Sequence, residues 1–359
     1  MHIVIVTRNM LSGGAERVIA QLLNEWSNLK IQCDLLLLEN VDCFYKIPED
    51  VVVHNIGKLS GNNVVNKIKQ YNCIRKLIKK ISPDIVLSMP EEIGIYVIGA
   101  MLGTRIPVVI SERNDPWVMP NKKITRLLRR LTYPFAKGII FQTEKAAEFF
   151  SDRIKRKSII LSNPLDISRI PKQYIGKRTK TVVGVGRLVE QKNFRLLIDA
   201  FYDFYEKHKE YRLIIYGEGD LRCELEEYSR KLPYGVVELP GVSDNLLEEI
   251  KSASMFVLSS DYEGVPNALI EAMSMGMPVV AADCSPGGAS LLIDNGINGL
   301  IVPVGDKAAM SSAMNRIADE PVFAVSIADE AAKIKERFDS AIVAKEWIDY
   351  LKKCGSVVE

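Results

Sequence analysis

Short runs rich in β-branched residues alternate with longer amphipathic stretches along almost the whole chain. Seven such runs occupy its first part: Ile3–Val6, Gln32–Leu38, Val51–Ile56, Asp84–Met89, Val108–Ser111, Gly138–Gln142 and Ser158–Leu161. Between them lie stretches of helical periodicity, such as Glu16–Trp26, Val65–Ile81 and Lys122–Tyr133. Repeated strand–helix units predict an α/β fold, in which a parallel sheet carries helices on both faces.

The pattern starts again at Thr181–Gly186, after a polar, proline-bearing segment at 163–180. Five more predicted strands follow: Leu213–Tyr216, Val236–Leu239, Met255–Leu258, Val279–Ala281 and Gly299–Val302. A chain of 359 residues is also too long for one ordinary hydrophobic core. We therefore predict two doubly wound, Rossmann-like domains joined near residue 165.

Composition narrows the class of protein. The apolar fraction of 47% and the mean hydropathy of +0.04 are typical of a soluble globular protein, and no apolar run is long enough for a membrane span. The start of the chain, Met1–Val6, lacks a basic region and a cleavage site, so it predicts a first strand and not a signal peptide. The six scattered cysteines and three histidines favour a reducing cytoplasm and argue against a structural zinc site.

Charge is distributed unevenly along the chain. Residues 1–165 hold 24 basic and 15 acidic residues, whereas the remainder holds 23 basic and 30 acidic residues. The two parts thus carry net charges of +9 and −7. This polarity suggests an anionic partner for the first part, although it can also arise by chance. No nucleic acid partner is expected.

The stretch DYEGVPNALIEAMSMGMP at 261–278 holds two glutamates separated by seven residues, Glu263 and Glu271. Pro266 suits the first position of a helix, so we expect Glu263 in the loop before the helix and Glu271 about one turn inside it. The free N–H groups of Asn267 to Ile270 would then attract a diphosphate, while the carboxylates accept hydrogen bonds from sugar hydroxyls. Taken alone, this spacing is more typical of two solvated glutamates around an N-capped helix.

Other candidate residues lie after predicted strands, where ligands bind in sheets of this class. Gly13 and Gly14 follow the first strand. The run Gly184–Asn193 has a Gly-x-Gly but no third glycine, and it carries two cations suited to a diphosphate, Arg187 and Lys192. Gly217, the pair Gly241–Val242 and the run SPGG at 285–288 follow later strands. Each loop is weak evidence by itself, but together they indicate one ligand site.

These residues match a known family. The set SGGAERV, VGRLVEQKNF, YGEGDL, YEGVPNALIEAMSMGMPVV and SPGG…NGINGLIVPVGD resembles the GT4-type retaining glycosyltransferases of GT-B fold. The resemblance covers essentially the whole chain and is strongest over 181–306. The variants SERNDP and SPGG resemble bacterial enzymes of lipid-linked, capsular or O-antigen polysaccharide synthesis.

The resemblance implies a fold and a reaction. Two Rossmann-like domains would face each other across a cleft: residues 1–165 with 340–359 on the acceptor side, and 166–339 binding the nucleotide-sugar. The reaction would move a hexosyl or N-acetylhexosaminyl group from a nucleotide diphosphate-sugar, expected to be a UDP-sugar, to a hydroxyl of a lipid-linked or growing glycan. No cofactor and no metal are expected, because cations would stabilise the leaving nucleotide.

The resemblance also implies a role for each matching residue. Arg187 and Lys192 would hold the diphosphate, Glu271 the ribose and Glu263 the transferred sugar. The donor would further contact the backbone or side chains of Gly13, Gly14, Gly186, Gly217, Gly241, Val242, Gly264, Val265, Pro266, Asn267 and Ala268. Where many relatives carry a histidine, this chain has Arg113 beside Glu112. Arg113 would therefore contact the sugar or the acceptor, or else form an ion pair with Glu112 or Asp115.

The segment 122–131 is basic and amphipathic, with Ile124, Leu127, Leu128 and Leu131 on one helical stripe. The preferred interpretation is that this stripe faces the core and leaves a solvated basic face. In the alternative interpretation Lys122, Lys123, Arg126, Arg129 and Arg130 lie on an anionic membrane. Together with the basic run 155–157, this alternative suits an acceptor that carries a polyprenyl diphosphate. We therefore expect an enzyme bound peripherally at the inner face of the membrane.

Three other functions remain open from the sequence. A UDP-sugar 2-epimerase shares the architecture but lacks the paired motifs of this chain. A dehydrogenase is disfavoured by the missing third glycine. A non-catalytic partner subunit that kept the fold is disfavoured because Arg187, Lys192, Glu263 and Glu271 are all present. The donor sugar, the acceptor linkage and the oligomeric state do not follow from the sequence.

Overall fold

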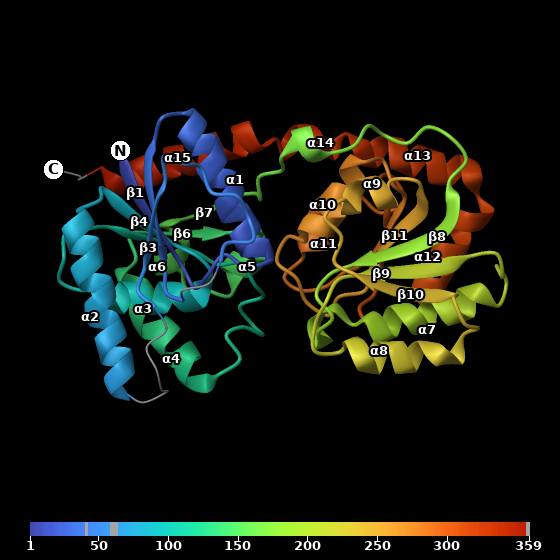
Figure 1. Ribbon diagram of the computed structural model, residues 1–359, viewed down its shortest axis with the longest axis horizontal. Helices are drawn as coiled ribbons and strands as arrows, with labels where there is room; N and C mark the ends of the chain where they lie inside the picture. The colour runs from blue at the N-terminus through green and yellow to red at the C-terminus, as the bar shows by residue number, and fades with distance from the viewer. Residues whose placement is uncertain (40–41, 58–63, 357–359) are drawn as a thin grey trace. The chain divides into compact units, whose positions relative to one another are not determined.

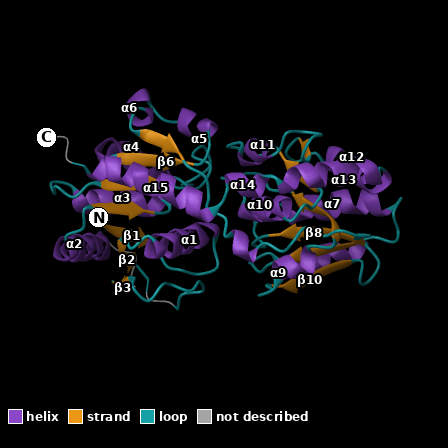
Figure 2. Cartoon of the chain, turned by 90° about the horizontal axis from the view of Figure 1, so that it is seen from above, coloured by secondary structure: helices purple, strands orange, loops and turns teal. Residues whose placement is uncertain are grey.

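The computed structural model describes residues 1–39, 42–57 and 64–356. It divides the chain into two compact units, which are Met1–Pro164 with Asp339–Glu359 (unit 1) and Leu165–Phe338 (unit 2). Residues 357–359 of the predicted 340–359 segment lie outside the described residues. Figures 1 and 2 show a sheet flanked by helices in each unit.

Unit 1 contains a parallel sheet of seven strands in the order β3-β2-β1-β4-β5-β6-β7. Its strands are β1 (His2–Thr7), β2 (Gln32–Leu37), β3 (Val52–Asn55), β4 (Ile85–Ser88), β5 (Val108–Ser111), β6 (Gly138–Phe141) and β7 (Ser158–Ile160). Its helices are α1 (Gly14–Asn28), α2 (Val64–Ile81), α3 (Glu91–Met101), α4 (Lys123–Thr132), the 3-10 helix η1 (Tyr133–Phe135), α5 (Glu144–Glu148), α6 (Asp152–Lys155) and α15 (Ser340–Gly355). Side chains alternate along β1, so that Ile3 and Ile5 pack with α1 and α15 while Val4 and Val6 pack with α2 and α3.

Unit 2 contains a parallel sheet of six strands in the order β10-β9-β8-β11-β12-β13. Its strands are β8 (Thr179–Val185), β9 (Arg212–Tyr216), β10 (Val237–Gly241), β11 (Ala253–Leu258), β12 (Val279–Ala282) and β13 (Leu300–Val302). Its helices are η2 (Ile167–Arg169), η3 (Glu190–Lys192), α7 (Phe194–Tyr205), α8 (Arg222–Tyr228), η4 (Ser229–Lys231), α9 (Leu246–Ile250), α10 (Asn267–Ser274), α11 (Gly288–Leu292), α12 (Lys307–Asp319), α13 (Pro321–Ala332) and α14 (Ile334–Arg337). One face packs on α7 and α12, and the other packs on α10 and α11.

These strands and helices confirm the alternation predicted from the sequence. The order of the strands in each sheet indicates where a ligand would bind. In both sheets the order of strand addition reverses beside the first strand, β1 or β8, because the later strands are added on its other side. In a doubly wound sheet the loops beyond the carboxyl ends of strands at this reversal form the usual ligand site. No helix among the described residues is long and apolar enough to cross a membrane.

Helix α15 is anchored on unit 1 by two buried tryptophans. The indole N–H of Trp347 donates to the Ser162 carbonyl at 3.1 Å, and the indole N–H of Trp26 in α1 donates to the Ala344 carbonyl at 3.0 Å. Both side chains are fully buried in the core that α1 and α15 share with the sheet. The final helix is therefore an integral part of unit 1.

We predict that Trp347→Ala destabilises unit 1 by about 3–5 kcal/mol, because it leaves a large cavity and removes a hydrogen bond. Urea unfolding followed by circular dichroism measures the change. Ile342→Ala provides the control, since Ile342 lies in the same helix but is exposed. Equal unfolding midpoints for the two variants would contradict the anchoring role of Trp347.

Candidate active site

Five loops of unit 2 follow the carboxyl ends of adjacent strands, and backbone hydrogen bonds join each loop to the next. Gly217 N–H donates to the Gly241 carbonyl at 2.8 Å, which joins the loops after β9 and β10. Gly186 N–H donates to the Tyr216 carbonyl at 3.0 Å, and Glu263 N–H donates to the Ser285 carbonyl at 2.9 Å. Asp261 N–H donates to the Gln191 carbonyl at 2.9 Å, which joins the loops after β11 and β8. The loops therefore form one continuous surface that brings together the candidate donor residues of this unit.

Glycine is required where these loops touch. At Gly217, where φ is +137°, an added Cβ would lie 1.9 Å from the Gly186 carbonyl oxygen. At Gly288 an added Cβ would lie 1.7 Å from the Gly264 carbonyl oxygen. Real side chains do not tolerate such contacts, so these two glycines let neighbouring loops approach each other.

Lys192 and Glu263 form an ion pair that links the loop after β8 to the loop after β11. Both side chains are largely buried, and Glu263 Oε1 accepts hydrogen bonds from Lys192 Nζ and, at 2.9 Å, from Ser260 Oγ. Ser259 Oγ donates to the Lys192 carbonyl at 2.8 Å, which fixes the backbone beneath the pair. The sequence predicted both charged residues but not their pairing, because 71 positions separate them and no spacing rule connects them.

Arg187 has a different environment from Lys192. It lies in the same loop but is exposed, and no ion pair to it is found within the described parts of the chain. Val242 is likewise exposed, in the loop after β10. The buried thiol of Cys284 lies near Glu263, and burial together with that carboxylate raises its pKa to about 12. Cys284 is therefore a neutral thiol in this site.

The start of α10 differs from the prediction in two details. Pro266 is the N-cap residue of α10 and not its first helical residue, with an extended backbone at ψ 110°. The N–H groups of Leu269 and Ile270 donate to the Pro266 carbonyl at 3.1 and 3.2 Å, so the expectation that they are free is wrong. Asn267 and Ala268, the first two residues of α10, are partly accessible. Gly264, Val265 and Glu271 are buried around them.

In unit 1, Gly13 and Gly14 form the start of α1. Gly13 is the N-cap residue, and its carbonyl accepts the Arg17 N–H at 3.0 Å and the Tyr45 hydroxyl at 3.1 Å. Their predicted contact with the donor phosphates stays a prediction. Among the described residues no group of three or more His, Cys, Asp or Glu side chains is arranged to hold a metal ion.

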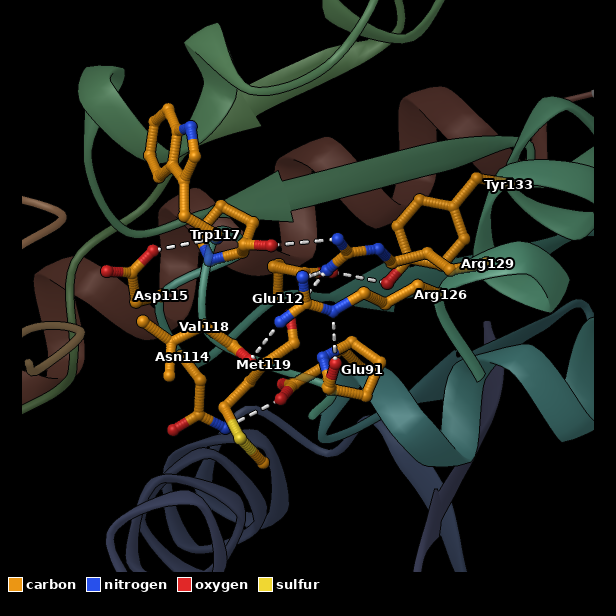
Figure 3. Close-up of polar contacts among 12 residues, drawn as sticks. Glu91, Glu112, Asn114, Asp115, Trp117, Val118, Met119, Arg126, Arg129 and Tyr133 are labelled. Atoms are coloured by element: carbon orange, nitrogen blue, oxygen red, sulfur yellow. Dashed lines mark hydrogen bonds and ion pairs between the residues drawn. The ribbon is translucent and has the colours of Figure 1, made fainter. Parts of the chain in front are cut away.

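The segment after β5 contains a cluster of buried charges (Figure 3). Glu91, at the start of α3, accepts the Arg113 N–H at 3.2 Å and the Asn114 side-chain amide at 2.6 Å. The Arg113 guanidinium donates to Asn163 Oδ1, and burial lowers its pKa to about 10. Arg113 is thus held at the carboxyl edge of the sheet, where the sequence placed it as a sugar or acceptor contact.

Glu112 pairs with Arg129 of α4 at 3.0 Å and accepts a hydrogen bond from the Tyr133 hydroxyl. Arg129 also donates to the Met119 carbonyl at 2.8 Å, as Figure 3 shows. It further donates to the Pro116 carbonyl at 2.9 Å, and its guanidinium lies over the rings of Phe149 and Phe150. Arg129 is therefore buried, and its prediction as a membrane-facing residue is wrong. A buried arginine is tolerated here because a carboxylate, two carbonyls and two rings satisfy it.

The orientation of α4 also corrects the sequence analysis. Ile124, Leu127 and Leu131 are exposed, whereas the preferred interpretation placed their stripe against the core. Leu128 alone of that stripe packs on the core of unit 1. Lys122, Lys123, Arg126 and Arg130 are exposed as predicted, although Arg126 donates to the Val118 and Pro120 carbonyls at 2.6 and 2.7 Å.

We predict that Arg129→Met destabilises unit 1 by about 3–5 kcal/mol, because it leaves Glu112 buried without its partner. The matched control is Arg130→Met, which removes an exposed arginine from the next position of the same helix and should change stability by less than about 0.5 kcal/mol. Urea unfolding measures both variants. Similar losses in the two variants would show that Arg129 is not the buried partner of Glu112.

Stability should also depend on pH through Glu112. Burial and the neighbouring Glu91 raise the pKa of Glu112 above its ordinary value of 4.5, although Arg129 opposes this shift. The folded state therefore binds this proton more tightly than the unfolded chain, so this contribution to stability is greatest below pH 4.5 and declines as the pH rises from there. Glu112→Gln should flatten the decline of unfolding midpoint over this range. A decline of unchanged slope in the variant would contradict the assignment.

Comparisons with known proteins match both units of the chain to glycosyltransferases. A family model described as "Glycosyltransferase Family 4" matches residues 12–169, and a model described as "Glycosyl transferases group 1" matches residues 179–320. An N-acetylgalactosamine-N,N'-diacetylbacillosaminyl-diphospho-undecaprenol 4-alpha-N-acetylgalactosaminyltransferase from Campylobacter jejuni is 29% identical and is matched over 95% of this chain and 96% of its own length.

Two further proteins are similar over nearly their whole length. A second N-acetyl-D-galactosaminyltransferase of Campylobacter jejuni, which the name describes as acting on a diNAcBac-PP-undecaprenol glycan, is 26% identical over 97% of both chains. The structure of HepE from Anabaena in complex with UDP-glucose superposes with a TM-score of 0.82 at 20% identity, over 98% of this chain and 100% of that one. The fold is therefore GT-B, and the chain belongs to the GT-B glycosyltransferases.

Proposed function

We propose that this glycosyltransferase moves a sugar from a UDP-sugar to a hydroxyl of a lipid-linked or growing surface glycan, with retention of anomeric configuration. The donor would bind at the joined loops of unit 2. The observation that carries the proposal is the Lys192–Glu263 ion pair, which places a fixed cation on the loop surface that also carries the first turn of α10. A cation and helical N–H groups on one surface suit a diphosphate.

Lys192 can bind phosphate without giving up Glu263. An ammonium group has three donors, and the described contact with Glu263 uses one of them. Glu263 would hold the ammonium in position while a second N–H of Lys192 reaches a phosphate oxygen. Both side-chain hydrogen bonds found for Glu263 use Oε1, so Oε2 would accept a hydroxyl of the transferred sugar. Glu263 is thus proposed to position Lys192 and to bind the sugar, and not to form a covalent intermediate.

Arg187 and Glu271 would complete the donor site. The exposed Arg187 would reach the diphosphate when the donor binds, and its charge would stabilise the leaving nucleotide together with Lys192. Glu271 would accept hydrogen bonds from the ribose, and Asn267 and Ala268 would donate to a phosphate or the sugar. Because these cations would replace a metal ion, we propose that donor binding and transfer proceed in the presence of a chelator.

The acceptor is proposed from the relatives. The two Campylobacter enzymes are named for glycans linked through a diphosphate to undecaprenol, and they match this chain over nearly its full length. An acceptor of that kind sits in a membrane, so the enzyme would work at the inner membrane face. We propose that the buried Arg113 contacts the acceptor or the transferred sugar. Its guanidinium donates to Asn163 and its backbone N–H donates to Glu91.

Calorimetry with a panel of nucleotide-sugars in the presence of EDTA tests the donor site. We expect selective binding of a UDP-sugar and a loss of affinity of about 10- to 100-fold in Lys192→Ala and in Glu271→Ala, since each removes a charge-assisted hydrogen bond. Lys180→Ala is the control, because Lys180 lies toward the opposite end of the same strand, β8.

Two results would contradict the proposal. A folded protein that binds no nucleotide-sugar would instead be the non-catalytic partner subunit considered above. Transfer that inverts the anomeric configuration, measured by NMR on the product, would disprove retention while leaving the donor site intact.

A further inference from the structure

Helix α4 presents an apolar stripe to solvent. Ile124, Leu127 and Leu131 are between 52% and 60% exposed, and Phe135 in the following 3-10 turn is 66% exposed. At about 100° per residue, the three helical side chains fall within an arc of about 60°. These four exposed large apolar side chains lie within twelve residues of one another, and exposed apolar residues grouped in this way mark an interaction site. We call these four residues the α4 stripe.

The charge around the α4 stripe has one sign. Residues 116–143 contain six Lys and Arg and no Asp or Glu. Lys123, Arg126 and Arg130 lie on the helical flank next to the stripe and are exposed, and Lys122 precedes the helix. An apolar stripe bordered by cations, without any carboxylate, suits an anionic lipid surface.

Hydrogen bonds from three basic side chains to backbone carbonyls hold this surface in shape. Arg126 donates to the carbonyls of Val118 and Pro120, and Arg129 donates to those of Pro116 and Met119, so the loop after β5 is fixed along α4. At the other end, Lys157 Nζ donates to the carbonyls of Tyr133, Pro134 and Ala136 around Phe135. These cations serve to position backbone carbonyls, although the sequence alone suggests that they contact lipid.

We propose that the α4 stripe and the adjoining loop tip, Trp117 and Val118, insert into an anionic membrane surface as one preformed platform. Lys122, Lys123 and Arg130 contact the lipid headgroups, while Arg126, Arg129 and Lys157 are positioning residues. The inference rests on the proposed action on a lipid-linked acceptor, because it identifies how unit 1 reaches that membrane. It differs from a purely electrostatic contact, since insertion of the apolar side chains carries the binding.

A second copy of the chain is a less suitable occupant. In a two-fold symmetric dimer the same patch faces itself, so the cations of one α4 would lie near those of the other. Like charges placed together in this way oppose association. The phosphate groups of a lipid surface are complementary to the same cations. Charge complementarity therefore favours the membrane.

The chain carries its own fluorescent reporter of insertion. Trp117 is 45% exposed, whereas the other two tryptophans, Trp26 and Trp347, are fully buried. Entry of Trp117 into lipid would shift its emission to shorter wavelength. We therefore measure cosedimentation and tryptophan emission with vesicles of phosphatidylcholine containing phosphatidylglycerol, and with vesicles of phosphatidylcholine alone.

Wild-type protein is expected to bind the anionic vesicles with a blue shift. Changing Ile124, Leu127 and Leu131 together to Gln should weaken binding by at least about tenfold. The control changes three exposed apolar residues elsewhere, Val322, Val325 and Ile342, to Gln and should bind as wild type. If both triple variants bind as wild type, insertion of the α4 stripe is disproved.

A matched pair of arginine variants tests the positioning role. Arg126→Met and Arg130→Met each remove one exposed charge from α4, but only Arg126 holds the loop that carries Trp117. We expect similar, modest losses of vesicle affinity, with the blue shift reduced only in Arg126→Met and restored in part by Arg126→Lys. Equal blue shifts in the first two variants would contradict the positioning role.

Two more measurements separate the possible failures. Sedimentation of wild type without lipid detects a dimer; a dimer that dissociates in the α4-stripe variant would mean that a second copy covers the stripe and would overturn the proposal. Calorimetry with UDP-sugar on the same proteins tests the donor site independently. Donor binding without vesicle binding would disprove the platform alone, whereas vesicle binding without donor binding would disprove the donor site alone.

Discussion

The ion pair between Lys192 and Glu263 connects the two loops on which the proposed donor site depends. These loops follow β8 and β11, which are neighbours in the sheet although far apart in sequence, and the change of strand order occurs between them. Because parallel strands end at one edge, their loops are brought together by the sheet itself. The ion pair then fixes Lys192, one of the two cations that the proposed mechanism uses. The glycine contacts between loops and the start of α10 extend the same surface.

Unit 1 uses a buried ion pair at the corresponding edge for a different purpose. Glu112 follows β5 directly and binds Arg129, which in turn binds the carbonyls of the loop between β5 and α4. Desolvating two charges is unfavourable, and such a pair is retained where it fixes a conformation. Here it allows α4 to pack with an arginine toward the core while Leu127 and Leu131 face solvent. The proposed membrane platform and the proposed acceptor contact at Arg113 both depend on this arrangement.

The sequence predicted the fold because the alternation of strands and helices is a local property. Each strand was found from a short β-branched run, and the glutamates at 263 and 271 were correctly placed before and inside α10. What it could not predict depended on contacts between distant residues. The period of the α4 pattern identifies an apolar stripe but not the side on which the core lies. The side that faces the core is decided by Glu112, the buried partner of Arg129, which lies seventeen positions earlier in the chain. The Lys192–Glu263 pair was missed for the same reason. The hydrogen bonds to the Pro266 carbonyl are local, and they were missed because the helix was predicted to begin one residue too early.

The central claim is that the loop surface of unit 2 binds the diphosphate of a UDP-sugar through Lys192, with Glu263 still in place. A crystal structure of the protein with UDP tests it most directly. The account predicts a phosphate oxygen within about 3 Å of Lys192 Nζ, the ion pair to Glu263 intact, and the ribose hydroxyls on Glu271. UDP bound elsewhere on unit 2, or bound with Lys192 turned away from the phosphates, would contradict it.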